Sequence, residues 1–353
     1  MQTLAQIEAV LNRIFEEQVD QINRVNPILA GIRKGGIGTS QQIFLSNKMD
    51  SDHNAGPILD GADVTIGNPT TSYAAAQLPW SSYAATFSVP DRLLQTLTSQ
   101  PSALGSLFET EITTAVQDLG DRIAADLYAG NVANGLVGMQ SIFDDANTYA
   151  QLDRSLAANA NWRSTVVDAD NAGATELSTD LLYQFEREFH DRNGYDFYPR
   201  PNRAIFLPKD LEVKYKQLFE TIDLSALGSA HFVNQANASG NLGYSSVTWQ
   251  RSPIIPDRNV STAAGDAVDS GRMYFVDLDQ VMIAQLTSNV PAAVVAQQQI
   301  DGARYAVPLQ GLTPRIKLKG KLGERIEGWV VVYIQLVTKS PKRSGGVIKS
   351  LAI

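Results

Sequence analysis

Apolar residues recur at steps of three and four through a long segment in the first half of the chain. The repeat runs from Ala103 to Tyr128, and Pro101 and Ser102 precede it as a helix start signal. Its apolar positions are Leu104, Leu107, Phe108, Ile112, Val116, Leu119, Ile123 and Leu127. This periodicity predicts one amphipathic helix of about 26 residues, or roughly 39 Å.

The polar side of this predicted helix is acidic. It carries a single basic residue, Arg122, against five acids: Glu109, Glu111, Asp118, Asp121 and Asp126. Carboxylates on an exposed helix face are commonly solvated, but the same face could meet a basic partner. Both interpretations stay open, and the candidate contacts with another subunit are Glu109, Glu111, Asp118 and Asp121.

Three further helices follow from the same kind of pattern. A first amphipathic helix spans Leu4 to Ile22 and ends before Pro27. Another runs from about Ser178, which can cap it, to Asn193, where Gly194 stops it. A short helix covers residues 210–219.

Alternating or continuous apolar runs predict the strands. The last of them is apolar on both faces, so it belongs in the middle of a sheet. The predicted strands are 63–66, 83–89, 203–207, 247–250, 273–276 and 326–337. Helices and strands mix without a strict alternating order, which favours an α+β fold over a doubly wound sheet.

The stretch from Gly56 to Pro90 has only two charged residues, Asp60 and Asp63. We interpret its predicted strands, 63–66 and 83–89, as a long two-stranded loop that projects from the body and lies across a neighbouring copy. Its candidate contact residues are Tyr73, Trp80, Tyr83 and Phe87. The glycine-rich segment before it, 31–42, lacks the context of a phosphate loop and is interpreted as an irregular linker.

Composition narrows the class of protein. The charged fraction of the 353 residues is 19%, below the usual quarter, as expected when protein covers much of the surface. A net charge of −8 argues against a protein devoted to phosphate backbones, and the absence of cysteine excludes disulfides and thiolate sites. No apolar run is long enough to span a membrane, and the N-terminal residues do not resemble a signal peptide, so we expect a cytosol-like compartment.

The C-terminal segment reverses the sign of the charge. From Arg315 to Ile353 the sequence contains nine basic residues and only two acidic ones, Glu324 and Glu327. This segment could pair with acidic groups of a neighbour or touch nucleic acid; we favour subunit pairing because no aromatic stacking platform accompanies it. Its candidate contacts are Lys317, Lys319 and Lys321.

No pattern of catalytic or metal-binding residues is present. His53, His190 and His231 lack metal-ligand spacing, and no nucleophile, zinc or calcium motif occurs. The carboxylate pairs 144–145 and 168–170 lie in loop-like sequence, where solvation is the common outcome. We therefore expect neither an enzyme nor a bound cofactor or metal.

The order of these features resembles the major capsid proteins of tailed bacteriophages, which have the Hong Kong 97-type coat fold. After the long helix come a Gly-Leu, then Asp153-Arg154-Ser155, then Trp162. Later segments that resemble the family read WQRSPIIPDRN, GRMYFVDLD and ERIEGWVVVYIQLVTKSP. The resemblance covers about Ile7 to Pro341 and rests on order and spacing, since each motif is weak alone.

The resemblance implies a division of the chain. The expected parts are an N-terminal arm (1–55), an extended loop (56–92), a peripheral domain with the long spine helix (93–140 and 283–322) and an axial domain (141–282 and 323–353). It also implies a subunit that assembles with itself into pentamers and hexamers of an icosahedral head, in which the loop overlies one neighbour and the arm braces another.

Further partners are implied in the same way. They are a separate scaffolding protein, a portal protein, a cement protein and packaged double-stranded DNA, contacted without sequence specificity, in a virion assembled in the bacterial host cytoplasm. Some members of the family cross-link their shells covalently through Lys–Asn bonds from a lysine of the extended loop. Because residues 49–208 contain no lysine, we expect no such cross-link here. The alternatives are an encapsulin-like nanocompartment shell and an α+β soluble enzyme.

Overall fold

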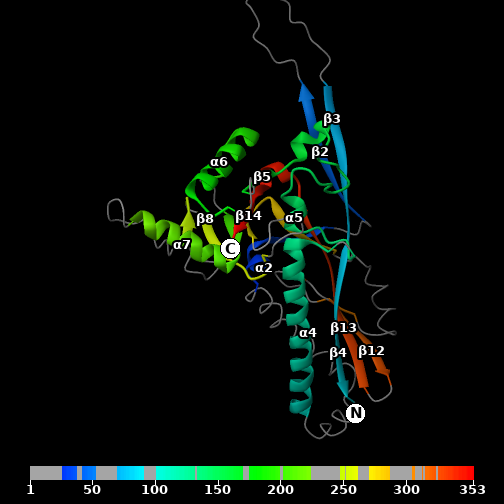
Figure 1. The fold of residues 1–353 in the computed structure, drawn as a ribbon. Helices are drawn as coiled ribbons and strands as arrows, with labels where there is room; N and C mark the ends of the chain where they lie inside the picture. Colours follow the sequence, from blue (N-terminus) through cyan, green and yellow to red (C-terminus); the bar gives the residue numbers. More distant parts are fainter. Residues whose placement is uncertain are drawn as a thin grey trace, which may run out of the picture.

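The computed structural model has two lobes and a projecting hairpin (Figure 1). The residues it describes are 26–37, 42–52, 70–90, 101–131, 133–169, 175–198, 202–223, 247–250, 252–260, 270–286, 304–306, 312, 315–322 and 325–353. The first predicted helix and the strand expected at 63–66 lie outside them. Within them, no helix is long and apolar enough to cross a membrane.

The first lobe is built on one long strand, β13 (Arg325–Thr338). One edge of β13 pairs antiparallel with β12 (Arg315–Leu322), which in turn pairs with β11 (Arg304–Ala306). Residues 325–334 of β13 also pair antiparallel with β4 (Ser81–Pro90) on the opposite edge, and residues 334–338 pair antiparallel with β10 (Val281–Leu286). The central position predicted for this doubly apolar strand is confirmed.

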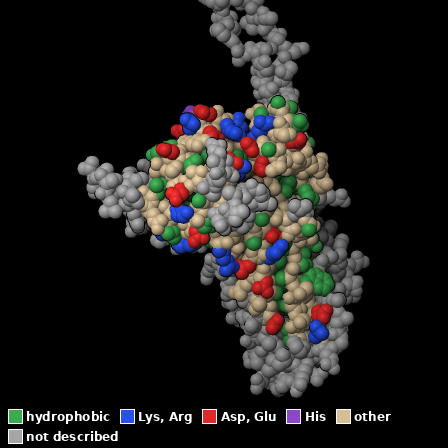
Figure 2. Space-filling view, viewed as in Figure 1, with side chains coloured by type: hydrophobic (Ala, Val, Ile, Leu, Met, Phe, Trp, Pro, Cys, Tyr) green, Lys and Arg blue, Asp and Glu red, His purple; other side chains and the backbone are tan. Residues whose placement is uncertain are grey.

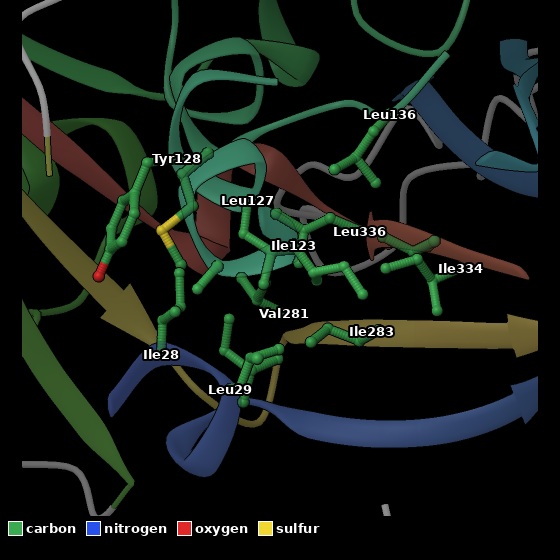
Figure 3. Close-up of a cluster of buried hydrophobic side chains, with 14 of the residues drawn as sticks. Ile28, Leu29, Ile123, Leu127, Tyr128, Leu136, Val281, Ile283, Ile334 and Leu336 are labelled. Carbon is green, nitrogen blue, oxygen red and sulfur yellow. The ribbon is translucent and has the colours of Figure 1, made fainter. Parts of the chain in front are cut away.

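The predicted spine helix is α4 (Pro101–Ala129), which packs along β4 and β13. Figure 3 shows Ile123 and Leu127 of α4 lying against β10 and β13 residues, beside the short helix α2 (Pro27–Gly31). These apolar residues belong to one continuous buried cluster. The long helix is therefore held by one apolar stripe, as its sequence period predicts.

The second lobe is a mixed sheet in the order β5-β14-β9-β6-β8-β7. Its strands are β5 (Thr165–Asp168), β6 (Arg203–Leu207), β7 (Val247–Trp249), β8 (Ser252–Pro256), β9 (Ser270–Asp277) and β14 (Gly345–Ala352). Helices α6 (Thr179–Asn193) and α7 (Lys209–Asp223) belong to this lobe (Figure 1). Aromatic rings dominate its core, where Phe185 stacks on Phe275 with centroids 3.9 Å apart.

The predicted boundaries of α6 are confirmed by its caps. The Ser178 side chain accepts a hydrogen bond from the Leu181 amide, and Gly194 ends the helix in the left-handed region with φ of 73°. Only a residue without a Cβ adopts that conformation freely, which explains the stop. There are also three short helices: α5 (Met139–Ile142) packs on α4, η1 (Ala157–Trp162) on β2 and α9, and α9 (Pro341–Ser344) on α6, β9 and β14.

The projecting hairpin differs from the predicted one. It consists of β2 (Gln42–Asp52) and β3 (Thr70–Pro79), which pair antiparallel as a separate two-stranded sheet and rise from the body (Figure 1). The strand predicted at 83–89 exists as β4, but it lies in the first sheet and not in the loop. The prediction of an irregular linker is also wrong for 33–37, which form β1 (Arg33–Ile37), parallel to β10.

Sheet membership also moves the expected domain boundaries. The boundary at 323 falls between β12 and β13, which pair with each other in the first sheet. The boundary at 283 falls inside β10. The chain passes from the first sheet to the second through α9, so we now propose the boundary near Ser340, with β14 alone of the C-terminal strands in the axial lobe.

Candidate subunit interface

The root of the hairpin is fixed by one buried glutamine of β13. Gln335 donates from Nε2 to the carbonyl oxygens of Pro79 at 2.7 Å and Gly135 at 2.8 Å. Its Oε1 accepts from the Val137 amide at 2.9 Å. The Gln335 side chain is inaccessible to solvent, so water cannot satisfy these buried carbonyl and amide groups, and Gln335 supplies their hydrogen bonds. Gln335 thereby ties the end of β3 to the loop that follows α4.

A second buried polar group holds the first residues of β4. The Asp126 carboxylate accepts hydrogen bonds from the Tyr83 hydroxyl at 2.8 Å, Asn131 Nδ2 at 2.8 Å and Arg122 Nε at 3.2 Å. Burial, followed by the hydrogen bond and charge of Asp126, raises the pKa of the Tyr83 phenol, so it remains a donor at all ordinary pH values. The prediction that Asp126 lies on the exposed acidic face is therefore wrong.

The end of α4 is also tied to the second lobe. The Tyr128 hydroxyl donates to Asp257 at 3.0 Å, in the loop after β8. The next residue, Arg258, forms an ion pair of 2.9 Å with Asp121, which also accepts from Asn26 Nδ2 at 3.3 Å. The two lobes are thus linked through the spine helix and not only through their sheets.

These contacts divide the four predicted acidic residues of α4. Asp118 is exposed and Glu111 partly exposed, so both remain available to another molecule. Asp121 is used by Arg258 within the chain. The Glu109 side chain lies outside the described residues, so its prediction stands unchanged.

The predicted aromatic contacts divide in the same way. Tyr83 and Phe87 are buried inside their own subunit, which replaces the expected contact with a neighbour. Trp80 stands between β3 and β4 and packs partly buried against the first core. Tyr73 lies on β3, in the projecting hairpin, where its backbone pairs with Lys48.

The expectation that the extended loop contains no lysine does not hold for the observed hairpin. The loop predicted at 56–92 lacks lysine, but the observed hairpin includes β2 and hence Lys48. The absence of lysine from residues 49–208 therefore does not make the hairpin free of lysine. The predicted basic contacts Lys317, Lys319 and Lys321 lie on β12, and their side chains are outside the described residues.

The segment after α4 is organised by a buried arginine within the Asp153-Arg154-Ser155 motif. Arg154 is fully buried and donates to the carbonyl oxygens of Asn147 at 2.7 Å and Ile142 at 2.8 Å, and also to that of Ser141. Trp162 donates from Nε1 to the Tyr149 carbonyl at 3.2 Å and its ring lies against the Tyr149 ring. The motif thus has a structural role.

The candidate acid–base residues have structural roles as well. Burial would raise the pKa of Asp144, but hydrogen bonds from the amides of Asn147 and Ala146 lower it overall, so the group stays ionised. Asp168 forms an ion pair of 2.9 Å with Lys349. On the surface, His190 Nδ1 lies 2.7 Å from Asp196 Oδ1. Among the described residues, no three metal-ligating side chains meet.

A small cavity of about 150 Å³ lies beside Asp144, at the edge of the second sheet. Arg272, Lys349, Asp145 and Asn147 are among its lining residues. Its charges balance one another, and it is shallow and polar, unlike the apolar concave pockets that hold small ligands.

The comparisons with known proteins agree with this architecture. No protein-family model and no curated protein matches the chain. Among solved structures, a chain of the cyanophage A-1(L) capsid asymmetric unit is similar with a TM-score of 0.69 at 17% identity, covering 93% of each chain. A chain of the holo-SrpI encapsulin complex from Synechococcus elongatus PCC 7942 has a TM-score of 0.55 at 11% identity, covering 92% of this chain and 87% of that one.

A third similar structure is the capsid of a native GTA particle. Its chain has a TM-score of 0.51 at 11% identity, with 93% of this chain and 90% of that chain covered. All three likenesses cover more than nine tenths of this chain. The resemblance predicted from the order of sequence features is therefore confirmed at the level of the fold: the chain has the α+β fold of the Hong Kong 97-type capsid proteins.

Proposed function

We propose that this protein is the structural subunit of an icosahedral phage head and assembles with itself into pentamers and hexamers that enclose double-stranded DNA. The observation that carries the proposal is a two-stranded hairpin that projects from a chain of capsid fold without joining either of its larger sheets. Its base is supported by its own chain, because Ile43, Ala76 and Leu78 are buried in the first core. A two-stranded ribbon is marginally stable alone, so we expect the part beyond this base to be supported by a neighbouring copy.

The described residues support a structural and not a catalytic role. Buried polar groups such as Gln335, Asp126 and Arg154 form hydrogen bonds that hold chain segments together. The similar solved structures are capsid and encapsulin chains. We extend the proposal to a scaffolding protein, a portal protein, a cement protein and packaged DNA as partners, and to a virion assembled in the bacterial host cytoplasm.

We further propose that α4 contributes to the subunit contact through its free acids. Glu111 and Asp118 are seven residues apart, which places them two turns apart on one side of the helix. Neither forms an ion pair with the part of the chain that the structure describes. Basic groups of an adjacent subunit, with Lys317, Lys319 and Lys321 on β12 as our candidates, would complement them.

Sedimentation velocity of the chain expressed with its scaffold tests both proposals. The wild type is expected to sediment as uniform particles far larger than the 38.3 kDa subunit. The double reversal Glu111→Lys/Asp118→Lys is expected to leave folded, unassembled subunits, while the control Asp180→Lys/Asp191→Lys on exposed positions of α6 assembles. A wild type that stays monomeric contradicts the shell proposal; normal assembly of the α4 reversal contradicts only the α4 contact.

An encapsulin-like compartment is the second candidate, because the encapsulin chain shares the fold. The higher TM-score of the cyanophage capsid chain favours the phage head. Electron microscopy of native particles distinguishes the two: a portal at one vertex and DNA inside support the head, and an enclosed protein cargo without a portal supports the compartment.

A further inference from the structure

The chain contains two Asn-Gly pairs, Asn134-Gly135 and Asn193-Gly194. In such a pair the backbone nitrogen of the glycine can attack the side-chain carbonyl carbon of the asparagine, because glycine has no Cβ to crowd the approach. The fold controls this reaction in two ways: it can engage the attacking nitrogen in a hydrogen bond, and it can place a donor beside the oxygen that gains negative charge. The two pairs differ in both respects.

The second pair is protected by the end of α6. The Gly194 amide donates to the His190 carbonyl at 2.7 Å, which holds its nitrogen in the helix cap. Asn193 Nδ2 donates to the Phe189 carbonyl at 3.0 Å, and Asn193 Oδ1 is buried with no donor among the described residues. Attack would place negative charge on that oxygen, where no hydrogen bond would stabilise it.

The first pair lies in a tight turn after α4. Asn131 and Leu136 close the turn through two backbone hydrogen bonds of 2.8 and 3.0 Å. Gly135 has φ of 74°, in the left-handed region, and its amide donates to no group in the part of the chain that the structure describes. The Ser82 amide donates to Asn134 Oδ1 at 3.3 Å. The turn thus leaves the attacking nitrogen free and supplies a donor to the oxygen that gains charge.

We propose that Asn134 is a site of spontaneous chemical modification in the folded protein. The Gly135 nitrogen forms a bond to Asn134 Cγ and the Cγ–Nδ2 bond breaks. The proton that Gly135 loses returns through water to the leaving nitrogen, which departs as ammonia. Water then opens the succinimide at either carbonyl, which gives aspartate or isoaspartate. No oxidant or reductant is needed, and the Ser82 amide stabilises the oxyanion that forms during the attack.

The new carboxylate would lie close to Asp126. The Asn134 side chain forms a hydrogen bond with the side chain of Tyr83, whose hydroxyl donates to Asp126 at 2.8 Å. The Asn134 amide also donates to Asn131 Oδ1, and Asn131 Nδ2 donates to Asp126. On the face shown in Figure 2, cations and anions are interspersed, so the repulsion is expected to come from Asp126 itself and not from a region of one sign.

Isoaspartate would also lengthen the main chain, because the chain then runs through the former side chain and gains a methylene group. The Gly135 carbonyl accepts from Gln335 Nε2 at 2.8 Å, and Gln335 Oε1 accepts from the Val137 amide at 2.9 Å. Displacement of Gly135 would weaken this set of bonds. The modification is therefore expected to loosen the root of the hairpin slowly and irreversibly.

Ageing of the purified wild-type subunit tests the proposal. Folded and urea-unfolded samples are incubated at mildly alkaline pH, and peptide mass spectrometry follows the replacement of NH2 by OH at each asparagine. In the folded protein, conversion of Asn134 is expected to be about tenfold faster than that of Asn193, and in urea the two rates should agree within about twofold. Hydroxylamine, which cleaves succinimides, should cut the folded protein between Asn134 and Gly135.

Two substitutions are matched controls for the cleavage. Asn134→Gln keeps an amide at this position but must close a larger ring, so cleavage by hydroxylamine should disappear. Asn193→Gln makes the same change at the protected pair and should leave the cleavage unchanged. In the aged wild type, the Val137 amide is expected to exchange its hydrogen faster than in fresh protein.

Three results would count against the proposal. Equal conversion of Asn134 and Asn193 in the folded protein, or conversion of neither, would overturn it. A tenfold difference that persists in urea would also overturn it, because the neighbouring sequence and not the fold would then set the rate. Unchanged exchange of the Val137 amide after conversion would overturn the expected loosening of the root. The reaction needs only the folded subunit, so the proposed shell function stands or fails separately.

Discussion

Strands β3 and β4 follow each other in the chain, each has ten residues, and neither carries a charge, but their surroundings differ. β4 pairs with β13 along its whole length and buries Tyr83, Phe87 and Val89. β3 pairs only with β2; its end near β4 buries Ala76 and Leu78 in the first core, and the ribbon then projects from the body (Figure 1). A charge-poor sequence thus indicates a strand covered by protein, without indicating whether the cover is its own subunit or another.

The largest expected difference between the two strands follows from removing one ring from each. Phe87→Ala leaves a cavity between β4 and α4 and should lower the free energy of unfolding by about 3–5 kcal/mol. Tyr73→Ala, in β3, should change it by less than about 1 kcal/mol while lowering particle yield. Urea unfolding of unassembled subunits and particle counting measure the two effects. Equal destabilisation by the two substitutions would erase the distinction.

The junction between the strands gives the next effect. Gln335→Ala leaves the Pro79 and Gly135 carbonyl oxygens and the Val137 amide without their partner, so the free energy of unfolding should fall by about 2–4 kcal/mol. Gln280→Ala, exposed in the turn between β9 and β10, is the matched control and should cost much less. Hydrogen exchange should also show faster exchange of the Val137 amide in the Gln335 variant. Unchanged exchange there would mean that Gln335 does not hold the root.

Alkaline pH should lower the free energy of unfolding through the buried tyrosines of the two lobes. Burial raises the pKa of Tyr128 and Tyr149, and Asp257 raises that of Tyr128 further, so the folded protein keeps phenol protons that the unfolded chain releases. The unfolded state then binds fewer protons above pH of about 10, and stability declines as pH rises past that value. Urea unfolding at pH 9 and 11 measures the decline. Tyr128→Phe should reduce its slope; an unchanged slope would assign the decline to other groups.

The smallest effect is expected at the link between α4 and the second lobe. Asp121 and Arg258 are both well exposed, so Asp121→Asn should lower the free energy of unfolding by only about 0.5 kcal/mol. Tyr128→Phe, which removes the buried bond to Asp257, should cost more. A double-mutant cycle over Asp121 and Arg258 in urea unfolding measures the pair. A coupling well above about 1 kcal/mol would show that the surface pair, and not the buried bond, holds the lobes together.

The elements with strong local patterns could be predicted from the sequence. The spine helix, the capped helix α6 and the doubly apolar β13 each have a periodicity or end signal that tertiary packing does not override. The pairing of the hairpin could not be predicted in the same way. β2 mixes apolar and polar residues without clean alternation, and the choice of its partner depends on contacts distant in sequence.

One buried anchor carried a signal that the charge pattern obscured. Asp126 stands seven residues after Leu119 and three after Ile123, which places it on the apolar side of the helix. A carboxylate at that position is buried only with donors around it, and Tyr83 and Asn131 supply them. Gln335 has no comparable signal, because a glutamine within an apolar strand does not reveal which loop it will reach.

An electron cryomicroscopy map of the assembled particle tests the central claim most directly, because it traces the hairpin from subunit to subunit. The account predicts a closed icosahedral shell in which β4 lies in its own sheet while the part of β2 and β3 beyond the base buried in the first core rests on a neighbouring copy. A shell in which the hairpin folds back on its own subunit, or purified protein that forms no shell at all, would contradict it.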